Sequence, residues 1–261
     1  MAYNIYVLDP AVWRVWVDGS NNGTRLTVRQ WGAQLQADLC FNLTTFNMAN
    51  GKPDTYVRVA WKDLCYGHEG HSELIDFGSG YQCRGYSNGI QAGKVNINKP
   101  MGGSRTRNGV GLTDRGHIII AQSTVSRTEK AFCQAVNDYV RARGQTVRTF
   151  VLEDGGGSTA GYSARASLWV APEGGRPVPT VLCAYLRQTP VITRPIYNGI
   201  KGEDARLIQT LMLTEADGSF GPGSASRLKN MQATFGFPAA LRCGILSAYT
   251  AQKMRLDFQI K

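Results

Sequence analysis

The stretch Leu152-Glu-Asp-Gly-Gly-Gly-Ser-Thr159 places an acidic pair, three glycines and two hydroxyls directly behind a run of strand-forming residues, 147–152. A carboxylate at a strand end can act as a base, a nucleophile or a metal ligand. Adjacent glycines let the backbone approach a ligand and expose its N–H groups. The stretch lacks the Gly-Lys-Ser/Thr of a Walker loop and the spaced glycines of a dinucleotide-binding turn. It predicts either a substrate loop that begins with Asp154 or a plain turn.

Two further polar stretches precede this one in the chain. Asn42-Leu-Thr-Thr-Phe46, followed by Asn47, ends a predicted buried strand at 37–43. Arg105-Thr-Arg-Asn-Gly-Val-Gly111 leads into a predicted hairpin at 111–121. In this order the three stretches resemble the phosphodiester glycosidase family. Its typical members carry an Asn-Gly-Gly-Phe-Phe-like block, an Arg-Thr-Ala-hydrophobic-Gly block and a Leu-Asp-Gly-Gly-Gly-Ser block. The resemblance covers residues 25–187.

The resemblance implies a glycoside hydrolase of the phosphodiester glycosidase type. It implies catalytic roles for Asp154, Arg105 and Asn42. It also implies substrate contacts from a second group of residues, namely Gly155, Gly156, Gly157, Ser158, Thr159, Thr106, Asn47 and Glu153.

The chain departs from the family pattern at two places. Leu43 and Thr44 stand where the family has two glycines, so the first loop is expected to differ. Glu153 is an extra acidic residue in front of Asp154. Neighbouring residues of a strand point to opposite faces, so only one of the two carboxylates can face a substrate. We align Asp154 with the family's aspartate because it adjoins the glycines.

The expected chemistry follows from the leaving group. A departing phosphate is already a stable anion and needs little proton donation, so charge stabilisation by arginine and backbone N–H groups matters more. Arg105 and the 155–158 backbone suit that role. Asp154 would stabilise an oxocarbenium-like carbon, attack it or activate water, and the sequence leaves these three roles open.

Local patterns predict an α+β protein with two domains. Residues 1–188 are expected to form a mixed-sheet catalytic domain, 189–199 a proline-containing linker, and 200–261 a small all-α domain of three helices at 204–213, 224–235 and 247–256. In the first domain, capping boxes at Thr27–Gln30 and Ser126–Glu129 predict two helices. The remaining elements are expected to be strands, at 3–8, 12–17, 37–43, 55–61, 93–98, 111–121, 147–152, 167–171 and 180–186.

The C-terminal segment has a resemblance of its own. Leu207-Ile-Gln-Thr-Leu211, Asp217-Gly-Ser-Phe-Gly-Pro222 and Gly244-Ile-Leu-Ser-Ala-Tyr-Thr250 follow the pattern of the peptidoglycan-binding three-helix module over residues 200–256. The resemblance implies bacterial peptidoglycan or wall polysaccharide as the partner. An interaction bundle without wall affinity is the alternative.

The sequence implies no cofactor and gives only a weak sign of a metal. His68, Glu69 and His71 could hold a divalent ion, but their spacing differs from the helical His-Glu-x-x-His motif, and a polar loop is the favoured interpretation. The tryptophans Trp13, Trp16, Trp31 and Trp61 are expected in the core, with stacking on a sugar as the alternative.

Charge and hydropathy narrow the cellular setting. The chain has 261 residues, and 29 Lys and Arg against 19 Asp and Glu give a net charge of +10. Such a charge attracts anionic polymers, and the scattered basic residues make nucleic acid an unlikely partner. No run approaches the ~18–20 apolar residues of a membrane span, and no signal peptide is visible. We expect a protein that is cytoplasmic when made and acts at the wall after lysis or another form of export.

These observations together predict a cell-wall-directed glycosidase that cleaves a sugar-1-phosphodiester or a related glycosidic bond, for example a bacteriophage endolysin. Two alternatives stay open. One is a non-catalytic binding protein of the wall or virion. The other is an intracellular hydrolase of phosphate-linked sugars.

Overall fold

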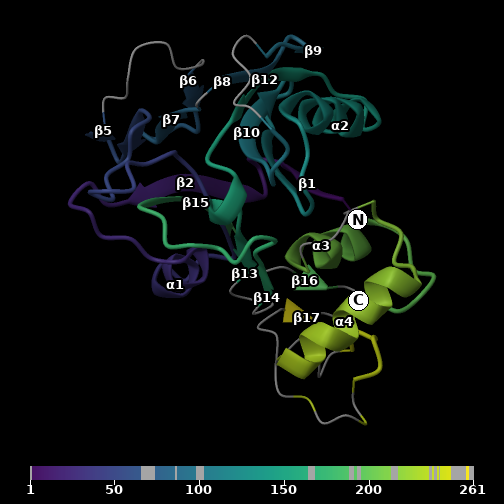
Figure 1. Ribbon diagram of the computed structural model, residues 1–261. Helices are drawn as coiled ribbons and strands as arrows, with labels where there is room; N and C mark the ends of the chain where they lie inside the picture. Colours follow the sequence, from purple (N-terminus) through teal and green to yellow (C-terminus); the bar gives the residue numbers. More distant parts are fainter. Residues whose placement is uncertain are drawn as a thin grey trace.

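The computed structural model describes residues 2–65, 74–85, 87–97, 103–163, 168–187, 191–192, 195–212, 217–234, 237, 240, 242–247 and 257–258. Two large antiparallel sheets share one hydrophobic cluster, and a helix covers the outer face of each (Figure 1). Tyr6 of one sheet and Phe41 of the other meet in this cluster, with ring centroids 5.5 Å apart. The layers therefore run helix, sheet, sheet, helix, which buries both faces of each sheet.

The six-stranded sheet packs against helix α2 (Glu129–Arg141). Ile119 and Phe150 on its outer face join Phe132 and Val136 of the helix in a second hydrophobic cluster. The predicted hairpin at 111–121 is confirmed as two paired antiparallel strands. In spatial order the strands are β1 (Tyr3–Leu8), β11 (Ile118–Ser123), β10 (Asn108–Thr113), β12 (Val147–Leu152), β8 (Ser87–Gln91) and β9 (Lys94–Val95).

Helix α2 begins later than the predicted capping box at Ser126. Thr128 is the N-cap, and its hydroxyl accepts a hydrogen bond from the Ala131 N–H at 3.2 Å. A threonine directly before the first helical turn satisfies one of its free N–H groups, which decides the start. Gly144 follows the last turn with φ +67°, a conformation that glycine adopts readily and that ends the helix.

The five-stranded sheet packs against helix α1 (Val28–Gln34). The predicted capping box is present: the Gln30 N–H donates to Thr27 Oγ1 at 3.2 Å, and the Thr27 N–H donates to Gln30 Oε1 at 2.9 Å. Trp31 of the helix packs on Cys40 and Tyr162 of the sheet. In spatial order the strands are β14 (Leu168–Val170), β13 (Gly161–Ser163), β3 (Leu39–Asn42), β15 (Thr180–Leu186) and β2 (Trp13–Gly19).

A third antiparallel sheet lies in the region that the sequence left mostly irregular. Val57, Ile75 and Cys83 from its strands are fully buried in the central cluster. Three- and four-residue strands are too short to show a hydrophobic period, which explains why only the first was predicted. In spatial order the strands are β5 (Lys62–Cys65), β4 (Val57–Val59), β7 (Gln82–Arg84) and β6 (Leu74–Asp76).

The prediction of a mixed-sheet domain followed by a small all-α domain of three helices is wrong. All three large sheets are antiparallel, and the described chain is mostly β. The C-terminal segment contains helices α3 (Glu203–Leu211) and α4 (Pro222–Thr234), and also strand β17 (Asp257–Phe258). This strand pairs in parallel with β16 (Val191–Ile192), inside the expected linker. Apart from Ser247, the third expected helix lies outside the described residues.

The apolar side chains of the C-terminal segment belong to the central cluster. Ile208, Phe220 and Leu246 are fully buried in the same continuous cluster as Tyr6 and Leu8 of β1. The amphipathic pattern of α3 was correctly seen in the sequence, but a pattern shows only that a face is buried and not what covers it. Here that face contributes to a core that strand β1 also reaches.

Two buried glutamines hold the turns of this segment. Gln209 donates from Nε2 to Asp217 Oδ1 at 2.8 Å, and its Oε1 accepts from the Gly218 N–H at 2.8 Å. Gln232 does the same for the next turn, because its Nε2 donates to the Ile245 carbonyl and its Oε1 accepts from the Gly244 N–H.

Among the helices of the described residues, none combines the length and the apolar character that a membrane span requires.

Candidate active site

The loop after β12 is fixed in place by the end of strand β3. The Asp154 N–H donates to the Leu43 carbonyl at 3.2 Å, and Asn42 Nδ2 donates to the Asp154 carbonyl at 2.7 Å. The Asn42 side chain also accepts from the Ala160 N–H at 3.0 Å, and the residue is fully buried. Asn42 therefore holds both ends of the glycine loop, and its catalytic role stays a prediction.

Asp154 faces a polar niche made by this loop and the segment 171–178. Its Oδ1 lies 4.0 Å from Arg176 Nη2, and its side chain is 15% exposed. Burial raises the pKa of Asp154 from 3.8 to about 6, although a hydrogen bond with Ser158 and the charge of Arg176 act in the opposite direction. Its Oδ2 makes no hydrogen bond with any described residue. One carboxylate oxygen therefore lies beside Arg176, while the other is buried without a hydrogen-bond partner among the described residues.

Arg176 places its guanidinium beside the Asp154 carboxylate. Its Nε donates to Ser158 Oγ at 2.6 Å, and its backbone N–H donates to the Gly157 carbonyl at 2.8 Å. The guanidinium lies 5.8 Å from the centre of the Phe46 ring, and its side chain is 39% exposed. Sequence reasoning missed Arg176, because it follows a Pro-Glu-Gly-Gly turn that carries no motif.

Arg105 lies on the other side of the glycine loop. A methyl group added at Gly156 would lie 3.9 Å from Arg105 Cδ and 3.6 Å from a carboxylate oxygen of Glu173. The Arg105 backbone pairs with Arg127, and the residue is exposed. The structure thus brings Arg105 to the predicted loop, next to Gly156.

Gly155 is required by a close contact, and Gly156 is favoured by its backbone conformation. A methyl group at Gly155 would lie 2.6 Å from the Thr106 carbonyl oxygen, and Gly156 has φ +58°. Thr106 is buried, and its Oγ1 donates to the Gly156 carbonyl at 3.0 Å. Hydrogen bonds from the Thr106 N–H and hydroxyl hold the pKa of Glu173 below its ordinary value. Thr106 therefore ties the glycine loop to the 171–178 segment.

Two predicted contact residues lie away from the niche. Glu153 is buried on the other side of the strand end, where Cys83 Sγ lies 3.6 Å from its Oε1. Burial raises the pKa of Glu153 well above its ordinary value. The Asn47 carboxamide accepts from the Ala49 N–H at 2.8 Å and shapes an exposed turn. Thr159 is buried behind the loop.

A second carboxylate, Asp54, lies near the niche. Its Oδ1 accepts a hydrogen bond from the Thr45 hydroxyl, and its N–H donates to the Thr45 carbonyl at 3.1 Å. The negative charge of Asp54 contributes to the raised pKa of Asp154. No sequence motif indicated Asp54. It lies here because the 46–53 loop is closed by an antiparallel bridge between Phe46 and Pro53.

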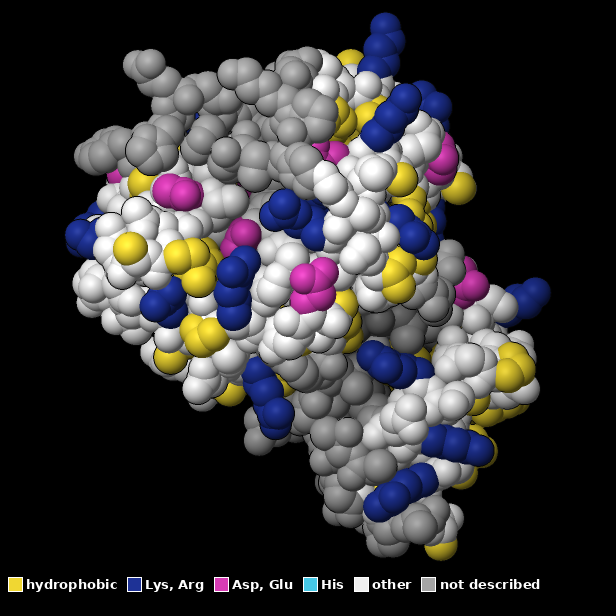
Figure 2. Space-filling model, viewed as in Figure 1, with side chains coloured by type: hydrophobic (Ala, Val, Ile, Leu, Met, Phe, Trp, Pro, Cys, Tyr) yellow, Lys and Arg dark blue, Asp and Glu magenta, His cyan; other side chains and the backbone are white. Residues whose placement is uncertain are grey.

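The described residues contain no cluster suited to a metal ion. The candidates His68, Glu69 and His71 lie outside the described residues. On the face drawn in Figure 2, basic and acidic side chains lie close together near the middle and do not form a patch of one sign. The niche contains both charges, with Arg105 and Arg176 near the carboxylates of Asp54, Asp154 and Glu173.

Comparison with solved structures identifies this architecture. The chain shares its fold with a glycosidase catalytic domain. That domain is zebrafish N-acetylglucosamine-1-phosphodiester α-N-acetylglucosaminidase, auto-inhibited by its pro-peptide. It matches with a TM-score of 0.55 and 13% identity over 71% of this chain and 83% of the other. A hypothetical protein from Synechocystis matches with a TM-score of 0.53 and 10% identity over 71% of this chain and 59% of the other. No protein-family model and no curated sequence matches.

Proposed function

We propose that the protein is a glycoside hydrolase that cleaves the bond between C1 of a sugar and the phosphate of a phosphodiester. The niche around Asp154 carries this proposal, because it combines a shielded carboxylate with an unused oxygen, an arginine at 4.0 Å and a glycine loop. The shared fold with a phosphodiester glycosidase supports the same bond type.

The reaction is a hydrolysis in which water supplies the new oxygen. The C1–O bond breaks, its electron pair leaves with the phosphate, and the water oxygen bonds to C1 while its proton passes to solvent. The leaving phosphate monoester carries its own negative charge, so the planar guanidinium of Arg176 would bind it with two parallel hydrogen bonds. Asp154 is ionised above pH 6 and would face the positive charge that develops at C1. Stabilisation, attack and water activation all remain open for this carboxylate.

We place the substrate in a bacterial wall polymer. The net charge of +10 favours an anionic polymer. Release by lysis, as for a bacteriophage endolysin, would bring the protein to that substrate.

The test compares two acidic residues that are neighbours in the chain. Asp154→Asn should lower turnover of N-acetylglucosamine-1-phosphodiesters at least a hundredfold, whereas Glu153→Gln should retain activity within a factor of five. Both variants should keep the wild-type circular dichroism spectrum. Loss of activity in Glu153→Gln with activity retained in Asp154→Asn would contradict the assignment. A folded wild type without turnover of any sugar phosphodiester would favour the non-catalytic binding protein.

A further inference from the structure

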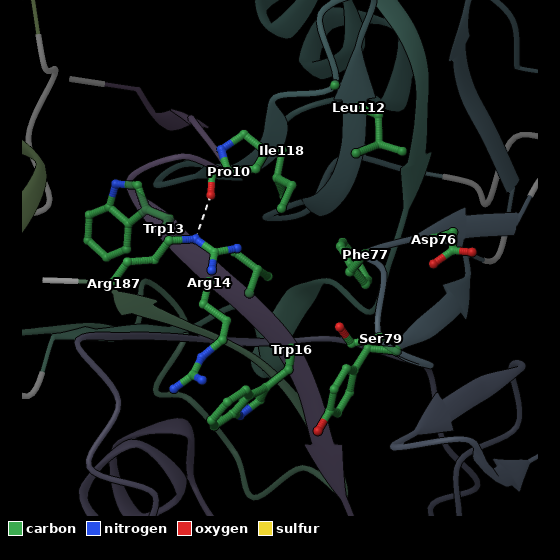
Figure 3. Close-up of a pocket in the computed structure, with 13 residues that line it drawn as sticks. Pro10, Trp13, Arg14, Trp16, Asp76, Phe77, Ser79, Leu112, Ile118 and Arg187 are labelled. Atoms are coloured by element: carbon green, nitrogen blue, oxygen red, sulfur yellow. Dashed lines mark hydrogen bonds between the residues drawn. The ribbon is translucent and has the colours of Figure 1, made fainter.

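A second enclosed space lies at the far end of the five-stranded sheet from Asp154. It has a volume of about 180 Å³ and lies between the start of β2, the turn 76–81 and the β10–β11 hairpin (Figure 3). Figure 3 shows Arg14 and Arg187 on one side of this cavity and Phe77 and Ser79 on the other. The lining residues that matter here are Arg14, Trp16, Phe77, Ser79, Tyr81 and Arg187.

Strand β15 separates this cavity from the carboxylate niche. The strand starts at Thr180, whose hydroxyl is bonded to Thr44 beside the Asp154 loop. It ends at Leu186, directly before Arg187 of the cavity. Seven strand residues span ~20 Å, so the two places are distinct.

Aromatic side chains form one wall of the cavity, and their positions are fixed. The Trp16 ring lies 6.0 Å from the Tyr81 ring at an interplanar angle of 25°, and 4.2 Å from the Tyr185 ring. Phe77 is held in the same turn by a hydrogen bond from its N–H to the Tyr81 carbonyl at 3.0 Å. Rings held in this way offer a flat apolar surface that loses little entropy when a ligand stacks on it.

Two guanidinium groups also line the cavity. The Arg14 guanidinium lies 4.7 Å from the centre of the Trp16 ring, which holds it beside the aromatic wall. Arg187 donates from Nε to the Pro10 carbonyl at 2.7 Å. This bond fixes the guanidinium, and its two terminal nitrogens make no hydrogen bond with any described residue. Two neighbouring guanidiniums favour an anionic group.

The turn that carries Phe77 is strained. Ser79 has φ +54°, between Gly78 and Gly80, which also have positive φ. A serine in this conformation is unfavourable and persists only where the surroundings hold it. Asp76 does so, because its Oδ1 accepts from the Gly78 N–H at 2.7 Å. The turn therefore keeps the Ser79 hydroxyl at the cavity, where it can bond a polar ligand.

We infer that this cavity is a second binding site, which takes one sugar ring that carries an anionic group. The ring would lie against Trp16, Phe77 and Tyr81, and the anion between Arg14 and Arg187. A volume below the ~300 Å³ of pockets for larger ligands fits a single ring. Sugars suit this lining because their apolar faces stack on aromatic rings while their edges bond hydroxyls. The site goes beyond the proposed reaction and would hold a separate unit of an anionic polysaccharide.

The experiment measures binding and not turnover, in full-length protein that carries Asp154→Asn. N-acetylglucosamine 1-phosphate is titrated and followed by tryptophan fluorescence and saturation-transfer NMR. Arg14→Ala and Arg187→Ala should each weaken binding at least tenfold. Arg148→Ala, at an exposed position of β12, serves as the matched control and should have no effect. N-acetylglucosamine and inorganic phosphate, which each lack one half of the ligand, should bind at least tenfold more weakly.

The remaining outcomes are decisive as well. Glucuronate that binds as tightly as the sugar phosphate would support the site and assign it to carboxylated sugars, and weaker glucuronate binding would assign it to phosphorylated ones. Binding that survives both Arg14→Ala and Arg187→Ala but is lost in Arg176→Ala would overturn the inference, because the ligand then occupies the carboxylate niche. Adenosine monophosphate that binds more tightly than both sugars, or no binding at ~10 mM sugar, would also overturn it.

Discussion

At the scale of single residues, the ionisation of Asp154 links stability to function. Its pKa in the folded protein is about 6, above the 3.8 of the unfolded chain, so the folded state binds this proton more tightly. The resulting stabilisation is complete below pH 3.8 and is lost as the pH rises through 6. The ionised form that the proposed reaction needs is therefore the less stable one, by ~3 kcal/mol.

Asp154→Asn should remove this dependence. Between pH 4 and pH 7 the free energy of unfolding should fall by ~2.4 kcal/mol less in the variant than in the wild type, as measured by urea unfolding. Asp138→Asn, at an exposed position of α2, is the control and should behave like the wild type. An Asp154→Asn curve parallel to the wild-type curve would show that Asp154 is not shielded from water.

The two arginines of the niche should differ in importance. Arg176 contacts both Ser158 and the carboxylate, whereas Arg105 reaches the loop beside Gly156. Lysine keeps the charge but loses the planar fork. We expect Arg176→Lys to lower kcat/KM of sugar phosphodiester hydrolysis by ~100-fold and Arg105→Lys to lower it less. Steady-state kinetics would contradict this ranking if Arg105→Lys were the more damaging change.

At the scale of elements, the candidate site around Asp154 is formed by loops that follow strands of both large sheets. The glycine loop follows β12, the Asn42 stretch ends β3, and the segment 171–178 joins β14 to β15. Backbone bonds between these loops, such as Arg176 N–H to the Gly157 carbonyl, hold them together. Side chains on such a support keep a fixed geometry, which is what electrostatic catalysis requires.

Gly155→Ala tests how tightly the glycine loop packs against its neighbours. The added methyl group would lie 2.6 Å from the Thr106 carbonyl, so the loop must shift. We expect a loss of ~1–3 kcal/mol in stability and a fall in turnover of at least tenfold. Gly223→Ala in α4 is the control, because a methyl group there meets no atom within 4 Å. Wild-type turnover in Gly155→Ala would show that the loop can move without consequence.

The sequence predicted the elements that carry strong local signals. The strand-forming run 147–152, the glycines after it and the capping box at Thr27 all act over a few residues, so their structures could be predicted. Arg176, Asp54 and the short strands of the third sheet could not, because their places depend on contacts between distant loops. For the same reason the sequence could not show that the Asn42 amide bonds the backbone at both ends of the 154–160 loop.

At the scale of the whole molecule, the central hydrophobic cluster joins the first and last parts of the chain. It runs from β1 and β2 to α3, α4 and Leu246. A wide cavity of about 840 Å³ lies beside this junction and is lined by residues from both parts, among them His117 and Arg206. A shared core implies that the two parts stabilise each other.

Unfolding should therefore occur in one transition. All five tryptophans lie before residue 170, so their fluorescence reports on the first part, whereas circular dichroism at 222 nm also senses α3 and α4. Urea curves from the two probes should coincide. A separate transition seen only by circular dichroism would show that the C-terminal segment folds alone.

The most direct test of the proposed reaction follows the oxygen atom of water. The protein is incubated with an N-acetylglucosamine-1-phosphodiester in ¹⁸O-labelled water, and the masses of the products are measured by mass spectrometry. Attack at C1 predicts that the label enters the sugar hydroxyl, that the phosphate monoester stays unlabelled, and that Asp154→Asn releases both products at least a hundredfold more slowly. Label in the phosphate would mean that water attacks phosphorus, and it would contradict the assignment of the niche as a glycosidase site.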